Sequence, residues 1–152
     1  MQSVRRIACE GRSPSSIQRE AHEATLHGKS VSLNFVVSQE TLRSLERVLS
    51  EQKSFGASVI ALNLSDSKLN VENLVAISAL FARSPLQTIV MERCGIDDRA
   101  APVLAELAAK CPKLCTLNVR NNGAEEFWRP RWRARAGPSS LCSPALPCCL
   151  SV

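Results

Sequence analysis

The residues that could carry out nucleophilic or metal chemistry are seven cysteines and two histidines, and their spacing builds no complete site. Cys111 and Cys115 lie four residues apart, a spacing that metal sites sometimes use, but a structural zinc site needs four ligands. His22 and His27 lie far upstream in a polar segment, where a solvated helix face explains them. We therefore expect no metal site and no nucleophile held against a histidine base.

Two further patterns suggest chemistry and are incomplete. Gly28-Lys29-Ser30 matches the end of a phosphate-binding loop, but Glu23 stands where G-x-x-x-x-G-K-S requires glycine. Asp66 and Glu92 could form a general acid–base pair, but the repeat described below puts them on successive strands that face open solvent. The sequence thus predicts a protein that is not an enzyme, has no cofactor and binds no small-molecule substrate.

Composition and charge narrow the class of protein. The chain has 152 residues, which fits one domain, and its longest nearly apolar run, Leu74–Ala82, is too short to span a bilayer. The first twelve residues lack the apolar core of a secretion signal, and an odd number of irregularly spaced cysteines argues against a disulfide framework. The first 123 positions hold 15 basic and 12 acidic residues, too dilute a surplus for a nucleic-acid interface. We expect a cytoplasmic protein, with nuclear, cytoskeletal or centrosomal association left open.

An internal repeat predicts the architecture. Three copies of one pattern begin at residues 59, 86 and 114, with apolar residues at positions 1, 4 and 6 and a small or polar residue at position 9. The copies read Val59-x-x-Leu62-x-Leu64-x-x-Ser67-x-Leu69, Leu86-x-x-Ile89-x-Met91-x-x-Cys94-x-Ile96 and Leu114-x-x-Leu117-x-Val119-x-x-Asn122-x-Ala124. An earlier, weaker copy is Leu33-x-Phe35-x-x-Ser38.

The segments between these copies have the apolar spacing of amphipathic helices. Each begins after a residue type that caps helices, and these candidate N-caps are Ser38, Asn70 and Asp97. The apolar positions that define the helix faces are Leu42, Leu45, Val48 and Leu49, then Leu74, Ile77, Leu80 and Phe81, then Ala100, Val103, Leu104, Leu107 and Ala108. Each repeat is therefore expected to contain a strand, a turn and a helix, and neighbouring repeats must stack to bury both faces.

The pattern resembles L-x-x-L-x-L-x-x-N/C-x-L of the leucine-rich repeat family, in its long cytoplasmic form similar to ribonuclease inhibitor, over about residues 30–124. The resemblance implies an α/β solenoid with a parallel sheet on its concave face and a core formed by Leu62, Leu64, Ile89, Met91, Leu117 and Val119. It also implies that the side chains at position 9 bond to backbone groups of the turns: Ser38, Ser67, Cys94 and Asn122. For Cys94, a reactive thiol beside Arg93 is the alternative to this structural role.

The family usually binds partners on the concave sheet, so the resemblance implies a noncatalytic protein–protein interaction module, a cytoplasmic adaptor or regulator whose protein partner is unknown. Alternation along a strand sends positions 3, 5, 7 and 8 outward. The candidate partner-binding residues on this surface are Asn63, Asp66, Val90, Glu92, Arg93, Asn118 and Arg120. Arg93 and Arg120 are the expected anchors, because arginine is enriched at binding hot spots. The alternative for each candidate is that it is a solvent-exposed strand residue with no role in binding.

The repeats, residues 30–123, have two different flanks. Residues 1–29 are interpreted as an N-terminal cap or an atypical repeat, with Val4-x-x-Ile7-x-Cys9 as a candidate strand and a candidate helix over 17–26. Residues 124–152 are rich in Pro, Arg and Cys and break the periodicity, so a disordered tail is predicted there. Leu114, Leu117 and Val119 would then lack a covering helix.

The tail carries the alternative function, a peripheral membrane protein anchored through a basic, cysteine-containing segment. The tail contains three aromatic residues close to four arginines, and the aromatic residues are Phe127, Trp128 and Trp132. This combination is typical of a membrane-surface or nucleic-acid-binding stretch. Cys149 lies four residues from the end of the sequence, where prenylation requires it, although Ser151 occupies a position that normally prefers an aliphatic residue.

Overall fold

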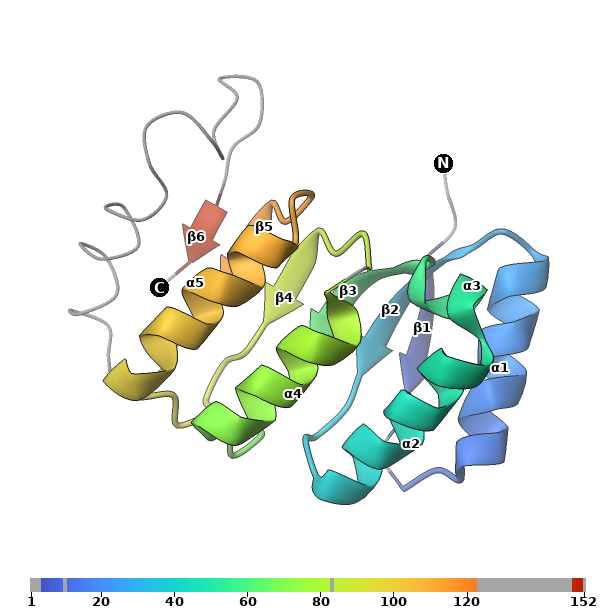
Figure 1. Cartoon of the computed structure of the whole chain (residues 1–152), viewed down its shortest axis with the longest axis horizontal. Helices are drawn as coiled ribbons and strands as arrows, with labels where there is room; N and C mark the ends of the chain where they lie inside the picture. The colour runs from blue at the N-terminus through green and yellow to red at the C-terminus, as the bar shows by residue number, and fades with distance from the viewer. Residues whose placement is uncertain (1–3, 10, 83, 123–148, 152) are drawn as a thin grey trace.

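The computed structural model describes residues 4–9, 11–82, 84–122 and 149–151, and these form an α/β fold around one parallel sheet (Figure 1). The strands lie in the sheet in chain order: β1 (Val4–Ala8), β2 (Ser30–Asn34), β3 (Val59–Asn63), β4 (Thr88–Val90), β5 (Thr116–Asn118) and β6 (Cys149–Ser151). Every strand is parallel to its neighbours. From β1 to β5 the chain repeats the same step of strand, turn and helix, as the periodicity predicts.

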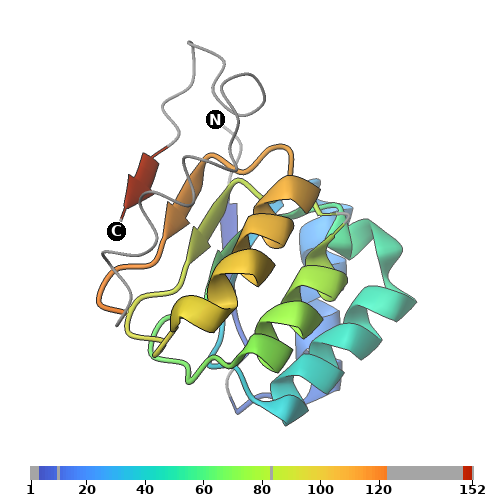
Figure 2. The same ribbon diagram turned by 60° about the vertical axis from the view of Figure 1, so that its left-hand side comes forward.

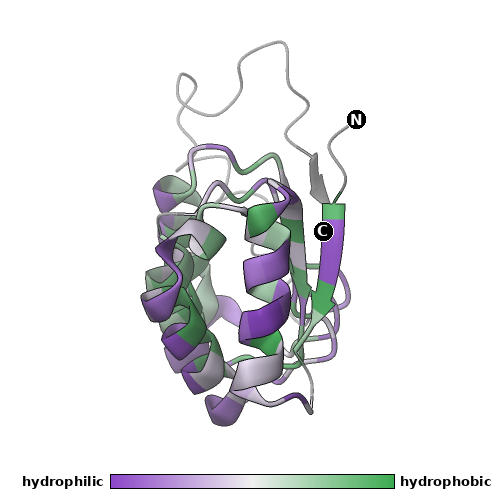
Figure 3. Cartoon of the chain, turned by 90° about the vertical axis from the view of Figure 1, so that its right-hand side faces the viewer, coloured by the Kyte–Doolittle hydropathy of each residue, from purple (hydrophilic) through white to green (hydrophobic). Residues whose placement is uncertain are grey.

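The helices form a second layer on one face of the sheet (Figures 2 and 3). They are α1 (Pro14–Leu26), α2 (Gln39–Glu51), the short α3 (Lys53–Gly56), α4 (Val71–Phe81), the 3-10 turn η1 (Asp98–Ala100) and α5 (Ala101–Lys110). Most of the predicted apolar positions are buried, as Leu45, Leu74 and Leu104 show with no exposed surface. One predicted position on each helix is half-buried: Leu49, Leu80 and Val103. Helix α3 was not predicted. Its Phe55 side chain is fully buried and packs this single helical turn against the core.

The predicted helix N-caps are confirmed. The Ser38 hydroxyl accepts from the Thr41 N–H at 3.1 Å, and the Asn70 side-chain oxygen accepts from the Asn73 N–H at 2.7 Å. The Asp97 carboxylate accepts from Arg99 at 3.1 Å and starts η1. These bonds satisfy backbone donors that a helix leaves free at its first turn, which is why the helices begin at these residues.

The core lies between the two layers and contains the six residues predicted to point inward. Leu62, Leu64, Ile89, Met91, Leu117 and Val119 are all buried, with exposed fractions between 0% and 6%. Strand β5, in the third copy of the pattern, therefore does not leave Leu117 and the following Val119 open, in contrast to the expectation for these two residues. In the sheet, Leu33 aligns with Leu62, which aligns with Ile89 and then with Leu117, so one apolar residue of each repeat occupies the same row.

The described part of the N-terminal flank, residues 4–9 and 11–29, extends the same sheet. The candidate strand is β1, whose Ile7 aligns with Leu33 and is fully buried, and the candidate helix is α1. The Ser13 hydroxyl caps α1 by accepting from the Ser16 N–H at 3.4 Å. This flank thus contains the strand and helix of one repeat at the β1 edge of the sheet.

The predicted disordered tail requires one correction. Cys149–Ser151 form strand β6, which pairs with β5 so that Thr116 faces Cys149 and Asn118 faces Ser151. The rest of the tail, including Phe127, Trp128 and Trp132, lies outside the described residues. The longest helices in the part of the chain that the structure describes have 13 residues, and none has the length and apolar character needed to cross a membrane.

Candidate partner-binding face

The sheet face opposite the helices, here called the open face, carries the side chains that alternation sends outward. The strand register aligns them in two rows: Ser32, Ala61, Thr88 and Thr116 in one, and Asn34, Asn63, Val90 and Asn118 in the next. Both rows were predicted from the repeat period alone. Two further outward rows were expected to begin with Val36 and with Val37, but Val37 is buried, with an exposed fraction of 8%, and its N–H donates to the Ser67 hydroxyl at 2.9 Å.

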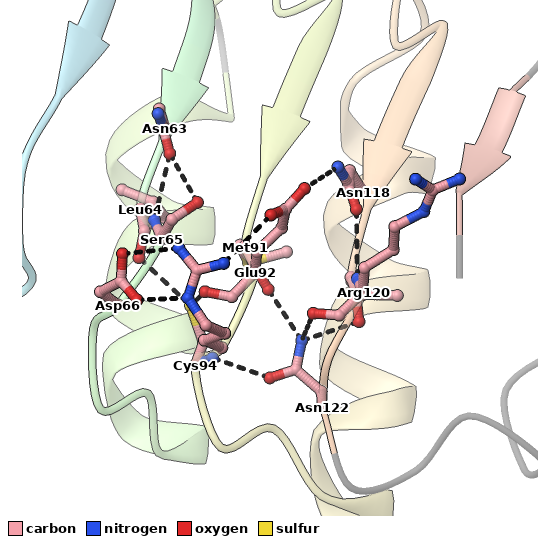
Figure 4. Close-up of polar contacts among 12 residues, drawn as sticks. Asn63, Leu64, Ser65, Asp66, Met91, Glu92, Cys94, Asn118, Arg120 and Asn122 are labelled. Carbon is pink, nitrogen blue, oxygen red and sulfur yellow. Dashed lines mark hydrogen bonds and ion pairs between the residues drawn. The ribbon is translucent and has the colours of Figure 1, made fainter.

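All seven predicted partner-binding residues lie on strands β3, β4 and β5 or in the turns that follow them. Figure 4 labels five of them: Asn63, Asp66, Glu92, Asn118 and Arg120. Asp66, Arg93 and Arg120 are exposed. The other four are half-buried: Asn63, Val90, Glu92 and Asn118. The structure therefore gathers these side chains on one surface, which is the geometric requirement for a shared binding face.

A left-handed backbone conformation recurs in the turns after these strands. Asp66, Arg93 and Asn121 have φ angles of 63°, 54° and 58°, and they occupy the same position of three successive repeats. Backbone bonds join the turns, from Asp66 N–H to Glu92 at 2.9 Å and from Arg93 N–H to Arg120 at 3.2 Å. Asp and Asn tolerate this conformation well, whereas arginine is strained in it, so the surrounding bonds must hold Arg93 in place.

Arg93 links two carboxylates on the open face. Its guanidinium donates to both oxygens of Asp66, at 2.6 and 2.9 Å, and lies 3.5 Å from a carboxylate oxygen of Glu92. The hydrogen bond from Arg93 lowers the pKa of Asp66. Asp66 and Glu92 are therefore partners of one arginine.

The network continues into the third repeat. The Asn118 side-chain amide donates to Glu92 at 2.6 Å and accepts from the Arg120 N–H at 3.1 Å. The Arg120 guanidinium itself has no hydrogen bond or ion pair among the described residues. Of the two expected anchors, only Arg93 is thus bonded to a carboxylate within the part of the chain that the structure describes.

Side chains at position 9 of the repeat connect neighbouring turns by hydrogen bonds to the backbone. The buried Asn122 side chain accepts from Cys94 and Ile96 N–H, at 2.9 and 3.2 Å, and donates to Met91, Val119 and Arg120 carbonyls. The Cys94 thiol donates to the Leu64 carbonyl at 3.2 Å, and burial raises its pKa, which favours a structural role over a reactive thiol. The prediction was wrong for Ser38, which is exposed and caps α2.

The remaining chemical motifs form no site in the described residues. No group of three or more potential metal ligands occurs there. Cys111 is fully buried, while Cys115 is half-buried and donates to the Lys113 carbonyl at 3.3 Å. His22 and His27 are exposed. Gly28 makes the turn between α1 and β2, with φ 59°, so the triplet leads into a strand.

No family model, curated protein or solved structure matches this chain. The resemblance to leucine-rich repeats thus stays an inference from the repeated pattern. Two features of the site were missed by sequence reasoning. One is the Arg93–Asp66 pairing; the other is Asn63, whose side-chain oxygen accepts from the Ser65 N–H and hydroxyl at 3.1 and 2.8 Å. For Asn63 a signal existed, because Asn followed by Ser two residues later favours such a local turn.

Proposed function

We propose that this chain is a noncatalytic protein-binding module of the leucine-rich repeat type, a short solenoid in the cytoplasm that acts as an adaptor or regulator. The observation that carries the proposal is the polar network from Asp66 through Arg93 and Glu92 to Asn118. It runs across three repeats on the face of the sheet that the described helices leave uncovered. A network of this kind holds its side chains in fixed places before a partner arrives, which lowers the entropy cost of binding.

The chemistry of the open face favours binding over catalysis. The lowered pKa of Asp66 makes this carboxylate a weaker base than an ordinary aspartate. The half-buried Val90 lies in the row between Asn63 and Asn118, and Arg120 lies beside them. An apolar centre with a polar rim is typical of protein interfaces. We infer a partner that places a carboxylate opposite Arg120 and an apolar side chain against Val90.

A quantitative pulldown tests this proposal. The tagged chain, Arg120→Glu and Val90→Asp are used as baits in cytosolic extract, and captured proteins are compared by mass spectrometry. Arg43→Glu is the matched control, because Arg43 is an exposed arginine on α2 in the other layer. At least one protein should be captured equally by the wild type and Arg43→Glu and at least about tenfold less by both open-face variants. If every captured protein is indifferent to Arg120→Glu and Val90→Asp while circular dichroism shows intact folds, the open face is not the binding surface.

A further inference from the structure

The segment Cys149–Ser151 repeats the pattern of the strands beside it. The last three residues of each strand from β2 onward read Ser-Leu-Asn in β2, Ala-Leu-Asn in β3, Thr-Ile-Val in β4, Thr-Leu-Asn in β5 and Cys-Leu-Ser in β6. The register places Leu150 beside Leu117, in the row of Leu62 and Ile89. Every other residue of this row that belongs to a described strand is buried. The edge of β5 therefore accepts a strand of defined pattern: a small or β-branched residue, then leucine or isoleucine, then a residue for the open face.

The backbone of the third repeat offers more donors than β6 covers. In the first copy, the Leu64 N–H donates to the Val90 carbonyl and the Asp66 N–H donates to the Glu92 carbonyl. In the second copy, the Met91 and Arg93 N–H groups donate in the same way to the Asn118 and Arg120 carbonyls. The corresponding donors of the third copy are Val119 and Asn121. Ser151 has the register place of Val90 and Asn118, but beyond it the described residues contain no acceptor for the Asn121 N–H. A segment two residues longer than β6 would satisfy this donor.

We propose that the edge of β5 is a strand-addition site, which Cys149–Ser151 fills in the structure and which an extended segment of a partner protein with the small–leucine–polar pattern takes over. Main-chain hydrogen bonds to an exposed sheet edge supply the affinity in this mode of recognition, and the row of Leu117 supplies the selectivity for leucine. The chain's own strand competes because it is tethered, which gives it a high effective concentration, yet it is only three residues long. The site lies at the edge of the sheet and does not depend on partner binding by the open face.

The first part of the test asks whether the chain's own segment occupies the edge. Thr116→Cys is made in a background of Cys115→Ser, Cys142→Ser and Cys148→Ser and is mildly oxidised. Neighbouring strands lie about 4.8 Å apart, within the reach of a disulfide between the new cysteine and Cys149. Thr88→Cys in the same background is the matched control, since it lies in the same row one strand further away, at about 10 Å. An intramolecular disulfide for Thr116→Cys alone supports the proposal. Equal cross-linking of both variants, or a disulfide-linked dimer, overturns it.

The second part asks whether an external strand takes the same place. The probe is a fluorescein-labelled peptide, Pro-Ser-Ser-Leu-Ser-Val, which is the segment 147–152 with serine in place of both cysteines. In an anisotropy titration it should bind the full chain with Leu150→Asp at least about tenfold more tightly than the chain with Ser151→Asp. The two changes add the same charge at adjacent positions, but only position 150 aligns with Leu117 in the register. Equal affinities overturn the proposal.

The cross-linked protein gives a comparison that does not depend on how Leu150→Asp folds. Oxidised Thr116→Cys has its own strand locked in place, so it should bind the peptide at least about tenfold more weakly than the same sample after reduction. Binding that is unchanged by reduction shows that the peptide attaches elsewhere, and it overturns the strand-addition site.

Discussion

The guanidinium of Arg93 donates hydrogen bonds to both carboxylate oxygens of Asp66, from the equivalent position in the turn of the next repeat. Both residues have positive φ angles, so the same backbone conformation presents two opposite charges side by side. The pair is more than half exposed on each side, and it therefore orders the open face more than it stabilises the fold.

This pairing predicts a pH effect that Arg93→Gln removes. Since the pKa of Asp66 is lower in the folded chain than in the unfolded chain, its contribution to stability is present above the unfolded pKa and is lost as the pH falls through the folded pKa. An NMR titration of the Asp66 side-chain carboxyl should give a pKa below the ordinary value in the wild type and close to it in Arg93→Gln. Arg120→Gln is the control and should leave this pKa unchanged. A wild-type value that Arg93→Gln does not raise would show that another group depresses it.

Asn122→Ala should destabilise the fold strongly. The side chain is buried and bonds to backbone groups of two turns, so its loss leaves buried donors and acceptors unsatisfied. We expect a loss of about 2 to 4 kcal/mol in the free energy of unfolding, because each unsatisfied buried group costs about 1 to 3 kcal/mol. Urea denaturation followed by circular dichroism measures it.

The matched control is Asn121→Gly at the neighbouring exposed position. Glycine adopts the positive φ of Asn121 without steric cost, so this variant should unfold close to the wild-type midpoint. If both variants unfold at the same urea concentration, the bonds of Asn122 do not hold the turns together.

Among the cysteines whose side chains the structure describes, alkylation should separate Cys115 from the buried Cys9, Cys94 and Cys111. Burial raises the pKa of the Cys9 thiol to about 11, and it raises the pKa of Cys94 and Cys111 as well. The thiolate is the form that reacts, so at about pH 8 iodoacetamide should modify Cys115 before these three. Peptide mass spectrometry over time gives the order, and unfolding in guanidinium should make all four react alike. Reaction of Cys94 as fast as Cys115 would instead support the alternative of a reactive thiol beside Arg93.

The features that the sequence predicted well are those that the repeat period controls. A period of 27 or 28 residues brings Leu62, Ile89 and Leu117 into one row, and it brings Asn63, Val90 and Asn118 into the adjacent row on the open face. The helix caps were predictable because their bonds reach only two or three residues along the chain.

The features that the sequence did not predict depend on contacts between repeats. The Arg93–Asp66 bond requires two turns in the same left-handed conformation, and no residue type in the pattern specifies that conformation for arginine. Val37 was placed outward by counting from a weak copy of the pattern, but the buried hydroxyl of Ser67 holds its backbone. Strand β6 has only three residues and follows a segment without periodicity, so the pattern gave no reason to expect it there.

Hydrogen exchange should reveal a gradient of stability across the sheet. Strand β4 lies between β3 and β5, whereas β5 has β4 on one side and only the three-residue β6 on the other. Amides of residues 116–119 should therefore exchange faster than those of 88–91, because local opening at an edge breaks fewer contacts. Leu150→Asp should widen this difference by removing β6, while Ser151→Asp should leave it as in the wild type and residues 59–63 should respond to neither change. Equal protection of β4 and β5, unaffected by Leu150→Asp, would mean that β6 contributes nothing to the end of the sheet and that the third repeat is stable without it.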